Sequence, residues 1–310
     1  MSTLTFTEQV APNAPSAGKQ VIYLKADGLL YKKNAAGVES VVTTPSLPTT
    51  GYGYRNVLLN PNFIINQDVK SGSIVLTANA YGHDGWMAGA GGCTYTIATV
   101  ENIQTVTISA GTLKQIIEGA NLQSGSYFLT WSGTAQGRVD SGAYGTTGVI
   151  GTAVGGVNQT VEFGVGTLSK MQYEIGVATP FEFRPIPFEL FFAQRYYEKT
   201  YAMSVAPGSV VTIGGQVVVA NLPATVTSTY VYSFQTFKVA KRAPPAVTMW
   251  SASGAVNTAN SDAPTNFAAG SATGTGPTEA GFAVVNSGGS NMAITYGTVY
   301  FNWVANSRLT

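Results

Sequence analysis

Few residues in this sequence have the types and spacing that catalysis requires. Of 310 residues, 15 are acidic and one is a histidine. Glycoside hydrolysis needs two carboxyl groups that face each other across a sugar, and the acids without an obvious structural role are Asp84, Asp140 and Glu162. His83 precedes Asp84, but no G-x-S-x-G elbow accompanies the pair. We therefore interpret His83 and Asp84 as a loop pair at the edge of a sandwich, and we expect a protein that is not an enzyme.

The sequence also has few residues that could bind a metal or a cofactor. The single cysteine, Cys93, excludes an intrachain disulfide, and one cysteine with one histidine does not make a zinc site. We interpret Cys93 as a small buried apolar group. The glycine-rich run at residues 89–92 lacks the Lys-Ser/Thr pair of a phosphate-binding loop. We expect neither a cofactor nor a bound metal.

Residues suited to binding are more abundant toward the C-terminus. Sugar sites on β proteins combine flat aromatic faces with polar side chains for the hydroxyl groups. Trp250 stands at the start of a small, polar, Gly-rich stretch, residues 251–280, which we predict to be an exposed loop region. We assign Trp303 to a core strand. The predicted ligand-binding residues are Trp250, Tyr232, Asn257 and Asn260.

The composition indicates strands and turns rather than helices. Charged residues make up 10% of the chain and glycines number 36, whereas an ordinary soluble domain is roughly 25% charged. The net charge of +1 favours neither nucleic acid nor a membrane surface. The N-terminus does not resemble a signal peptide, and no apolar run is long enough to span a membrane. We expect synthesis in a host cytoplasm and release by lysis.

Turn and strand signals divide the chain into modules. Residues 1–43 hold short strands joined by Gly-containing turns; about 40 residues bury little core alone, so this module should need a partner. Residues 44–55 form a Pro/Gly/Thr linker. Residues 56–185 alternate apolar and polar residues, which is typical of an antiparallel sandwich or jelly roll. Residues 200–310 predict a C-terminal β-sandwich.

One helix is predicted over residues 186–199, where it connects the two larger β regions. Pro187 suits the first helical position. The residues that share one face at helical spacing are Phe188, Phe191, Phe192 and Arg195. Two interpretations stay open: this aromatic face caps the edge of a core, or it lies at the axis of an oligomer.

Segments spread along the chain resemble those of a known family. They are TFTEQVAP (5–12), IYLKADGLLY (22–31), LLNPNF (58–63), YGHDGW (81–86), QIIEG (115–119), FLTWSGTA (128–135), ATPFEFRP (178–185), AQRYYEK (193–199) and FNWVANSRL (301–309). In this order they resemble the appendage proteins of tailed bacteriophages, of the small tail-fibre or head-fibre type. One departure is Gly85, which stands where the family has arginine.

The resemblance implies an N-terminal adaptor hairpin, a jelly-roll body and a homotrimer located on the virion. It implies attachment to a phage tail, collar or capsid protein through the N-terminus, and we assign this role to Phe6, Val10, Tyr23 and Tyr31. The distal domain would then meet a bacterial surface polysaccharide. Two alternatives stay open, a capsid or collar decoration protein without host binding and a polysaccharide-degrading tailspike.

Overall fold

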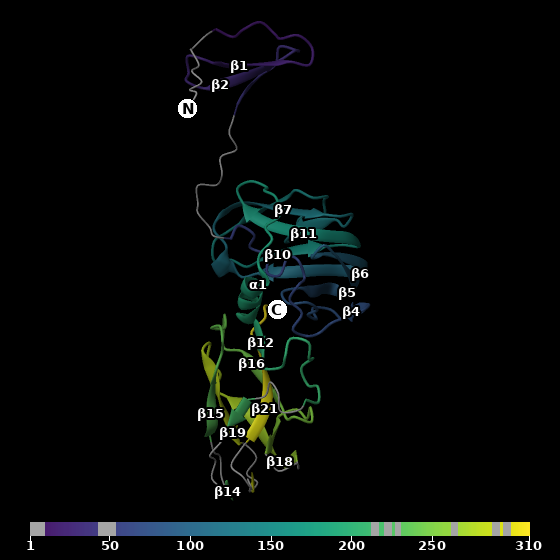
Figure 1. Ribbon diagram of the computed structural model, residues 1–310, viewed down its shortest axis with the longest axis vertical. Helices are drawn as coiled ribbons and strands as arrows, with labels where there is room; N and C mark the ends of the chain where they lie inside the picture. The colour runs from purple at the N-terminus through teal and green to yellow at the C-terminus, as the bar shows by residue number, and fades with distance from the viewer. Residues whose placement is uncertain are drawn as a thin grey trace. The chain divides into compact units, whose positions relative to one another are not determined.

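The computed structural model describes residues 10–42, 54–211, 217–219, 225–226, 231–261, 266–286, 292–293 and 299–310. Within these ranges the protein consists mostly of antiparallel strands, with a single α-helix, α1 (Ile186–Gln194), and one 3₁₀ turn, η1 (Gly119–Asn121) (Figure 1). The expected mostly-β class is therefore confirmed. The chain forms two compact units, Met1–Tyr52 and Gly53–Thr310.

The N-terminal unit is a three-stranded antiparallel sheet. Its strands are β1 (Gln20–Leu24), β2 (Leu30–Asn34) and β3 (Glu39–Val41), paired in that order. Gly28 turns the chain between β1 and β2 with a φ of 76°, which glycine adopts at little cost. Tyr23 and Tyr31 lie opposite each other, with ring centroids 6.1 Å apart. They form the small interior of this unit.

The first part of the second unit is a β-sandwich. Its strands are β4 (Ile74–Leu76), β5 (Met87–Val100), β6 (Ile103–Ile117), β7 (Gly125–Ser132), β8 (Gly137–Val139), β9 (Val149–Ala153), β10 (Gln159–Phe163) and β11 (Gly166–Ile175). They pair in the order β4-β5-β6-β11-β7-β9, and β10 pairs with both β6 and β8. β11 pairs with β6 over residues 166–168 and with β7 from Ser169 onward, and the register of the second pairing shifts between Ser169 and Gln172. One strand therefore pairs with both neighbours along its length.

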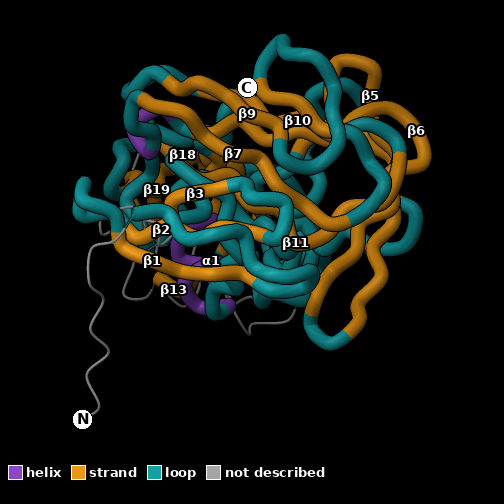
Figure 2. Tube along the Cα trace, turned by 90° about the horizontal axis from the view of Figure 1, so that it is seen from above, coloured by secondary structure: helices purple, strands orange, loops and turns teal. Residues whose placement is uncertain are grey.

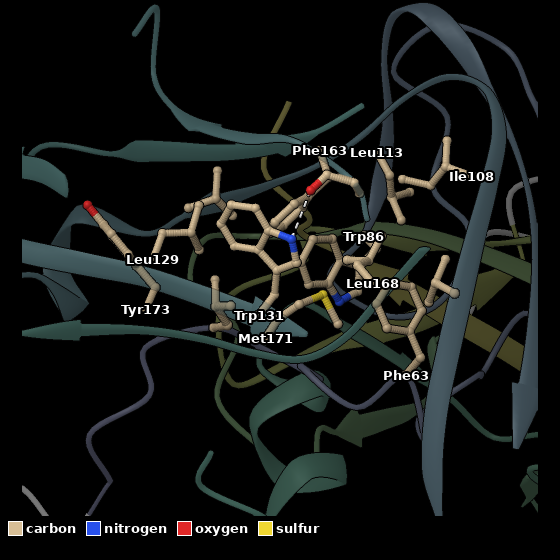
Figure 3. Packing of buried hydrophobic residues seen from close by; sticks show 14 of the residues in the cluster. Phe63, Trp86, Ile108, Leu113, Leu129, Trp131, Phe163, Leu168, Met171 and Tyr173 are labelled. Carbon is tan, nitrogen blue, oxygen red and sulfur yellow. Dashed lines mark hydrogen bonds between the residues drawn. The ribbon is translucent and has the colours of Figure 1, made fainter. Parts of the chain in front are cut away.

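Aromatic side chains fill the space between the two layers (Figure 3). The Trp131 indole meets the Phe163 ring edge-on at 5.1 Å and donates a hydrogen bond of 2.9 Å to the carbonyl of Ala135. Phe63 stacks on Trp86 at 4.9 Å. Cys93 is buried in the same cluster, as expected, and burial raises the pKa of its thiol to about 11.

Glycines permit the bend in the long hairpin formed by β5 and β6, whose two strands run side by side in Figure 2. The pairing is irregular between Ala88 and Cys93, so the run at residues 89–92 belongs to a bent strand. Gly111 has a φ of 70°, and a Cβ at this position would lie 2.1 Å from the carbonyl oxygen of Gly92. Only glycine fits there without a shift of the backbone.

Helix α1 follows the sandwich and is shorter than the helix predicted over residues 186–199. The buried carboxylate of Glu189 in its first turn pairs with Arg184 at 2.6 Å. The helix ends at Gln194, and β12 (Tyr197–Lys199) is a strand that pairs with the C-terminal strand β21 (Val299–Asn306). The prediction was wrong for the last residues because pairing with β21, far along the chain, decides their conformation.

The C-terminal region adds β13 (Val217–Val219), β14 (Thr225–Val226), β15 (Val231–Thr236), β16 (Ala246–Trp250), β17 (Thr258–Ser261), β18 (Asn266–Thr275), β19 (Gly281–Asn286) and β20 (Met292–Ala293). The main sheet runs β12-β21-β17-β18-β19-β15, and β16 and β13 also pair with β21. The prediction of a loop over residues 251–280 was wrong, because β17 and β18 lie there. Their small residues join the sheet through main-chain pairing, which needs no large side chain. Trp303 packs against Phe237 and Phe282, as its assignment to the core required.

Buried ion pairs join the sandwich to the C-terminal sheet. Both terminal guanidinium nitrogens of Arg308 lie 3.1 Å from the Asp68 carboxylate, and the guanidinium stacks 3.6 Å from the centroid of the Tyr197 ring. The Tyr81 hydroxyl donates a 2.5 Å hydrogen bond to the carbonyl of Leu309. The end of the chain is thus bonded to the sandwich, although its last strand belongs to the other sheet.

Candidate functional site

Each carboxylate that was considered for catalysis accepts hydrogen bonds from neighbouring groups. The buried Asp84 carboxylate accepts hydrogen bonds from the main-chain N–H (2.8 Å) and the side-chain amide (2.7 Å) of Gln67, and burial raises its pKa. Asp140 accepts a 2.8 Å bond from the main-chain N–H of Thr160. These carboxylates stabilise local backbone.

Glu162 and His83 also form hydrogen bonds with neighbouring side chains. Burial favours protonation of Glu162, but hydrogen bonds from Thr112 and Arg138 outweigh it and lower the pKa. His83 and Asp84 lie in a turn before β5, as expected of a loop pair, and the His83 Nδ1 lies 2.9 Å from the Tyr95 hydroxyl. Burial lowers the pKa of His83 to about 4. No group of three potential metal ligands occurs among the residues that the structure describes.

Trp250 lies at the end of β16, on one face of the C-terminal sheet. In antiparallel strands, residues directly opposite each other project to the same face. Trp250 is opposite Asn302 of β21, and Asn260 of β17 is opposite Tyr300 of β21. Tyr300 and Asn302 are two residues apart on one strand and therefore share a face. We define the Trp250 face as Trp250, Asn260, Tyr300 and Asn302.

The segment that follows β12 packs against the Trp250 face. The Tyr201 ring meets the Trp250 indole edge-on at 6.1 Å. A Cβ on Gly208, whose φ is 81°, would lie 3.1 Å from the indole nitrogen. The indole is consequently half-buried, which leaves part of its ring open while fixing its orientation.

Asn302 has an unusual position beneath this face. It is fully buried, and its side-chain oxygen accepts a 3.1 Å bond from the Thr200 hydroxyl. Its amide nitrogen has no hydrogen-bond partner in the protein. Whichever way the amide is turned, Thr200 can satisfy only one of its two polar atoms. Buried polar groups nearly always have partners, and Trp303 Nε1 is a second buried group of β21 without one.

The structure brings together some of the predicted ligand-binding residues and separates others. Asn260 shares the face with Trp250, and its side-chain oxygen accepts a hydrogen bond from the main-chain N–H of Ala252. Asn257 is exposed at a turn, with a φ of 56°, and donates its main-chain N–H to Met249. Tyr232 lies in β15, at the opposite end of the sheet order from β21, and its side chain is outside the described residues.

Sequence reasoning missed Tyr201, Tyr300 and Asn302. Asn302 stands between Phe301 and Trp303, whose side chains face the core. The alternation in this strand was therefore a signal that Asn302 faces the other side. Tyr201 carried no such signal, because its approach to Trp250 depends on a contact between distant segments.

The predicted aromatic face of α1 is divided. Phe188 and Phe191 are 48% and 53% exposed, whereas Phe192 packs edge-on against Tyr54 at 5.3 Å. Arg195 is turned toward the sandwich, where it pairs with Glu118 at 2.9 Å. The exposed apolar side chains around the helix define the α1 patch: Tyr54, Phe183, Ile186, Phe188 and Phe191.

The predicted anchoring residues also differ in position. Phe6 lies outside the described residues. Val10 is 91% exposed, but Tyr23 is fully buried within the N-terminal sheet. Tyr31 is half-buried, with the Lys25 ammonium 4.2 Å from its ring centroid. Three further apolar side chains of this unit, Ile22, Leu29 and Val38, are exposed.

The comparisons with known proteins found no match: no family model, no curated protein and no solved structure is similar to this chain. Within the described residues, no helix has the length and hydropathy to cross a membrane.

Proposed function

We propose that the chain is a subunit of a short fibre on a tailed-bacteriophage particle. It attaches to a tail, collar or capsid protein through its N-terminal unit, associates with copies of itself as a homotrimer, and binds a bacterial surface glycan with its C-terminal sheet. The observation that carries the binding role is the Trp250 face, where the half-buried Trp250 lies on the same face as the half-buried Asn260 and Tyr300.

The chemistry of this face suits a sugar. An indole offers a flat apolar surface for the C–H groups of a pyranose ring, and amides both donate to and accept from hydroxyl groups. The indole is oriented by Tyr201 before any ligand arrives. A ligand that meets a preformed surface loses less conformational entropy on binding.

The α1 patch supports association between copies. Exposed large apolar side chains gathered in one place mark interaction surfaces. The nearby charges do not oppose contact, because Arg184 and Glu189 are buried and paired with each other. An aromatic side chain buries about 150–250 Å² when fully covered, so each copy could cover several hundred Å² of this patch. The number of copies, three, comes from the resemblance alone.

The N-terminal unit supports an attachment role. It is a separate compact unit whose sheet leaves Val10, Ile22 and Leu29 exposed. A sheet this small gains stability when a partner covers such side chains. We expect Tyr23 to stabilise the unit itself rather than to touch the partner, because it is already buried.

The test is binding of the fluorescently labelled full chain to a panel of bacterial cells and to their purified surface glycans. We expect binding to the cells and the glycan of one strain. Trp250→Ala should weaken it by about five- to 150-fold, since stacking on an aromatic ring contributes about 1–3 kcal/mol in comparable flat contacts. Phe234→Ala, which removes an exposed aromatic side chain of β15, is the matched control.

The outcomes separate the candidate functions. Binding that survives Trp250→Ala would place the glycan elsewhere on the chain. A folded chain that binds no cell and no glycan would refute host binding and leave a decoration protein. Release of new reducing ends from the polysaccharide would instead show a tailspike enzyme.

A further inference from the structure

The described elements around the Trp250 face contain no side chain that carries a charge at neutral pH. Strands β16, β17 and β21 have no Asp, Glu, Lys, Arg or His, and neither does the segment over residues 200–211. In the sequence, no lysine or arginine occurs between residues 200 and 237 or between 243 and 307. The two charged residues within those spans are both acidic, Asp262 and Glu279.

The cations nearest in sequence are used elsewhere. The buried Lys199 ammonium donates to the carbonyl oxygens of Gln67, Met203 and Val205 at 2.6, 3.2 and 2.8 Å. Lys241 is buried against the Glu198 carboxylate at 2.6 Å. Arg308 pairs with Asp68, and the Arg242 Nε donates to the carbonyl of Ser307. Each of these groups is bonded to other parts of the protein.

A further described cation lies away from the face. Lys238 is exposed, and the neighbouring Phe237 packs on Trp303, which projects to the side of β21 opposite Asn302 and the Trp250 face. A carboxylate, phosphate or sulfate on a ligand at Trp250 would therefore lose water without gaining a basic partner. Burying an unpaired charge is costly, and proteins that recognise anionic groups place arginine or lysine against them.

We propose that the ligand of the Trp250 face is a neutral saccharide, recognised by stacking on the indole and by hydrogen bonds from hydroxyl or acetamido groups to Asn260 and Tyr300. This inference rests on the proposed glycan-binding function and narrows it to one ligand class. Such contacts are insensitive to screening, because they contain no ion pair.

Thr258 offers a place to test the charge of the ligand. It lies two residues before Asn260 on β17, and its hydroxyl donates a 2.7 Å bond to the carbonyl of Ala255 at the surface. Thr258→Lys and Thr258→Glu introduce a positive or a negative charge on β17, two residues from Asn260. A neutral ligand should bind both variants alike, whereas an anionic ligand should prefer the lysine variant.

The experiment measures the Kd of the full chain and both variants for neutral and for anionic bacterial polysaccharides, in 0.05 M and in 1 M salt, values that span about 14 to 3 Å in screening length. We expect binding to a neutral polysaccharide, with Kd values that agree within about twofold between the salts and between the variants. A more than tenfold preference of Thr258→Lys for an anionic polysaccharide, lost at high salt, would overturn the neutral class while keeping glycan binding. Failure of all folded proteins to bind any polysaccharide would overturn the proposed function itself.

Discussion

His83 lies between Phe63 and Tyr95 inside the sandwich, and burial lowers the pKa of its imidazole to about 4. In the unfolded chain the same group has its ordinary pKa of 6.5. Between these two values the unfolded chain binds the proton and the folded protein does not. The free energy of unfolding therefore does not depend on this residue above pH 6.5, and it decreases as the pH falls from 6.5 to about 4.

We expect the free energy of unfolding to decrease by about 3 kcal/mol between pH 7 and pH 4 through this one residue, at about 1.4 kcal/mol for each tenfold change in the proton equilibrium. Urea unfolding at a series of pH values would measure it. His83→Gln, which keeps a polar group near Tyr95, should flatten this part of the pH profile. Because the chain has one histidine, imidazole NMR signals report its titration without ambiguity; a pKa near 6.5 in the folded protein would contradict the prediction.

At the scale of elements, the bend of the β5–β6 hairpin depends on Gly111. We expect Gly111→Ala to cost about 2–4 kcal/mol of unfolding free energy, because it combines a left-handed backbone with a clash against the Gly92 carbonyl. Gly91→Ala is the matched control, since no atom lies within 4 Å of its added Cβ. Thermal unfolding gives the melting temperatures of the two variants. Equal values would show that the hairpin accommodates the added Cβ at residue 111 without loss of stability.

Helix α1 presents its outer side chains without cover from this chain. Replacing Phe188 and Phe191 by aspartate should separate associated copies while leaving each copy folded, because both side chains are about half exposed. Sedimentation velocity gives the size, and circular dichroism checks the fold. Ile150→Asp, on the exposed side of β9, is the control. An unchanged sedimentation coefficient in the double variant would favour a helix that only caps the edge of the core.

At the scale of the whole molecule, Arg308 connects the end of the chain to the sandwich. Its guanidinium bonds to Asp68 and stacks on Tyr197. Removing one partner of a fully buried pair costs about 3–5 kcal/mol, and because the Asp68 side chain is 17% exposed we place the cost at the lower end of this range. We expect Arg308→Ala to lower the free energy of unfolding by this amount. Arg308→Lys should restore little of it, since lysine lacks the planar guanidinium group.

Denaturant unfolding, followed separately by the fluorescence of sandwich and C-terminal tryptophans, would show whether the two regions then unfold apart. Arg138→Ala, which breaks a more exposed pair with Glu162, should cost less than about 1 kcal/mol. Equal losses of unfolding free energy in Arg308→Ala and Arg138→Ala would mean that the Arg308 contact does not hold the two regions together.

Local patterns in the sequence were enough for the fold class and for many strands. Alternation of apolar and polar residues over residues 56–185 indicated antiparallel strands, since side chains on a strand alternate between a buried and an open face. The burial of Trp303 followed from its assignment to a core strand, and that of Cys93 from the apolar character of a lone thiol. Pro187 correctly indicated the start of the helix, because its ring suits the first turn.

Only the tertiary structure decided which distant residues meet. Pairing with β21 turned residues 197–199 into a strand, and pairing between β17 and β18 ordered small residues that carry little propensity of their own. The same long-range registers placed Asn260, Tyr300 and Asn302 on the face of Trp250 and left Tyr232 at another edge. A single sequence records the local preference of each residue. It does not record the register between strands that are far apart in the chain, and register determines which side chains share a face.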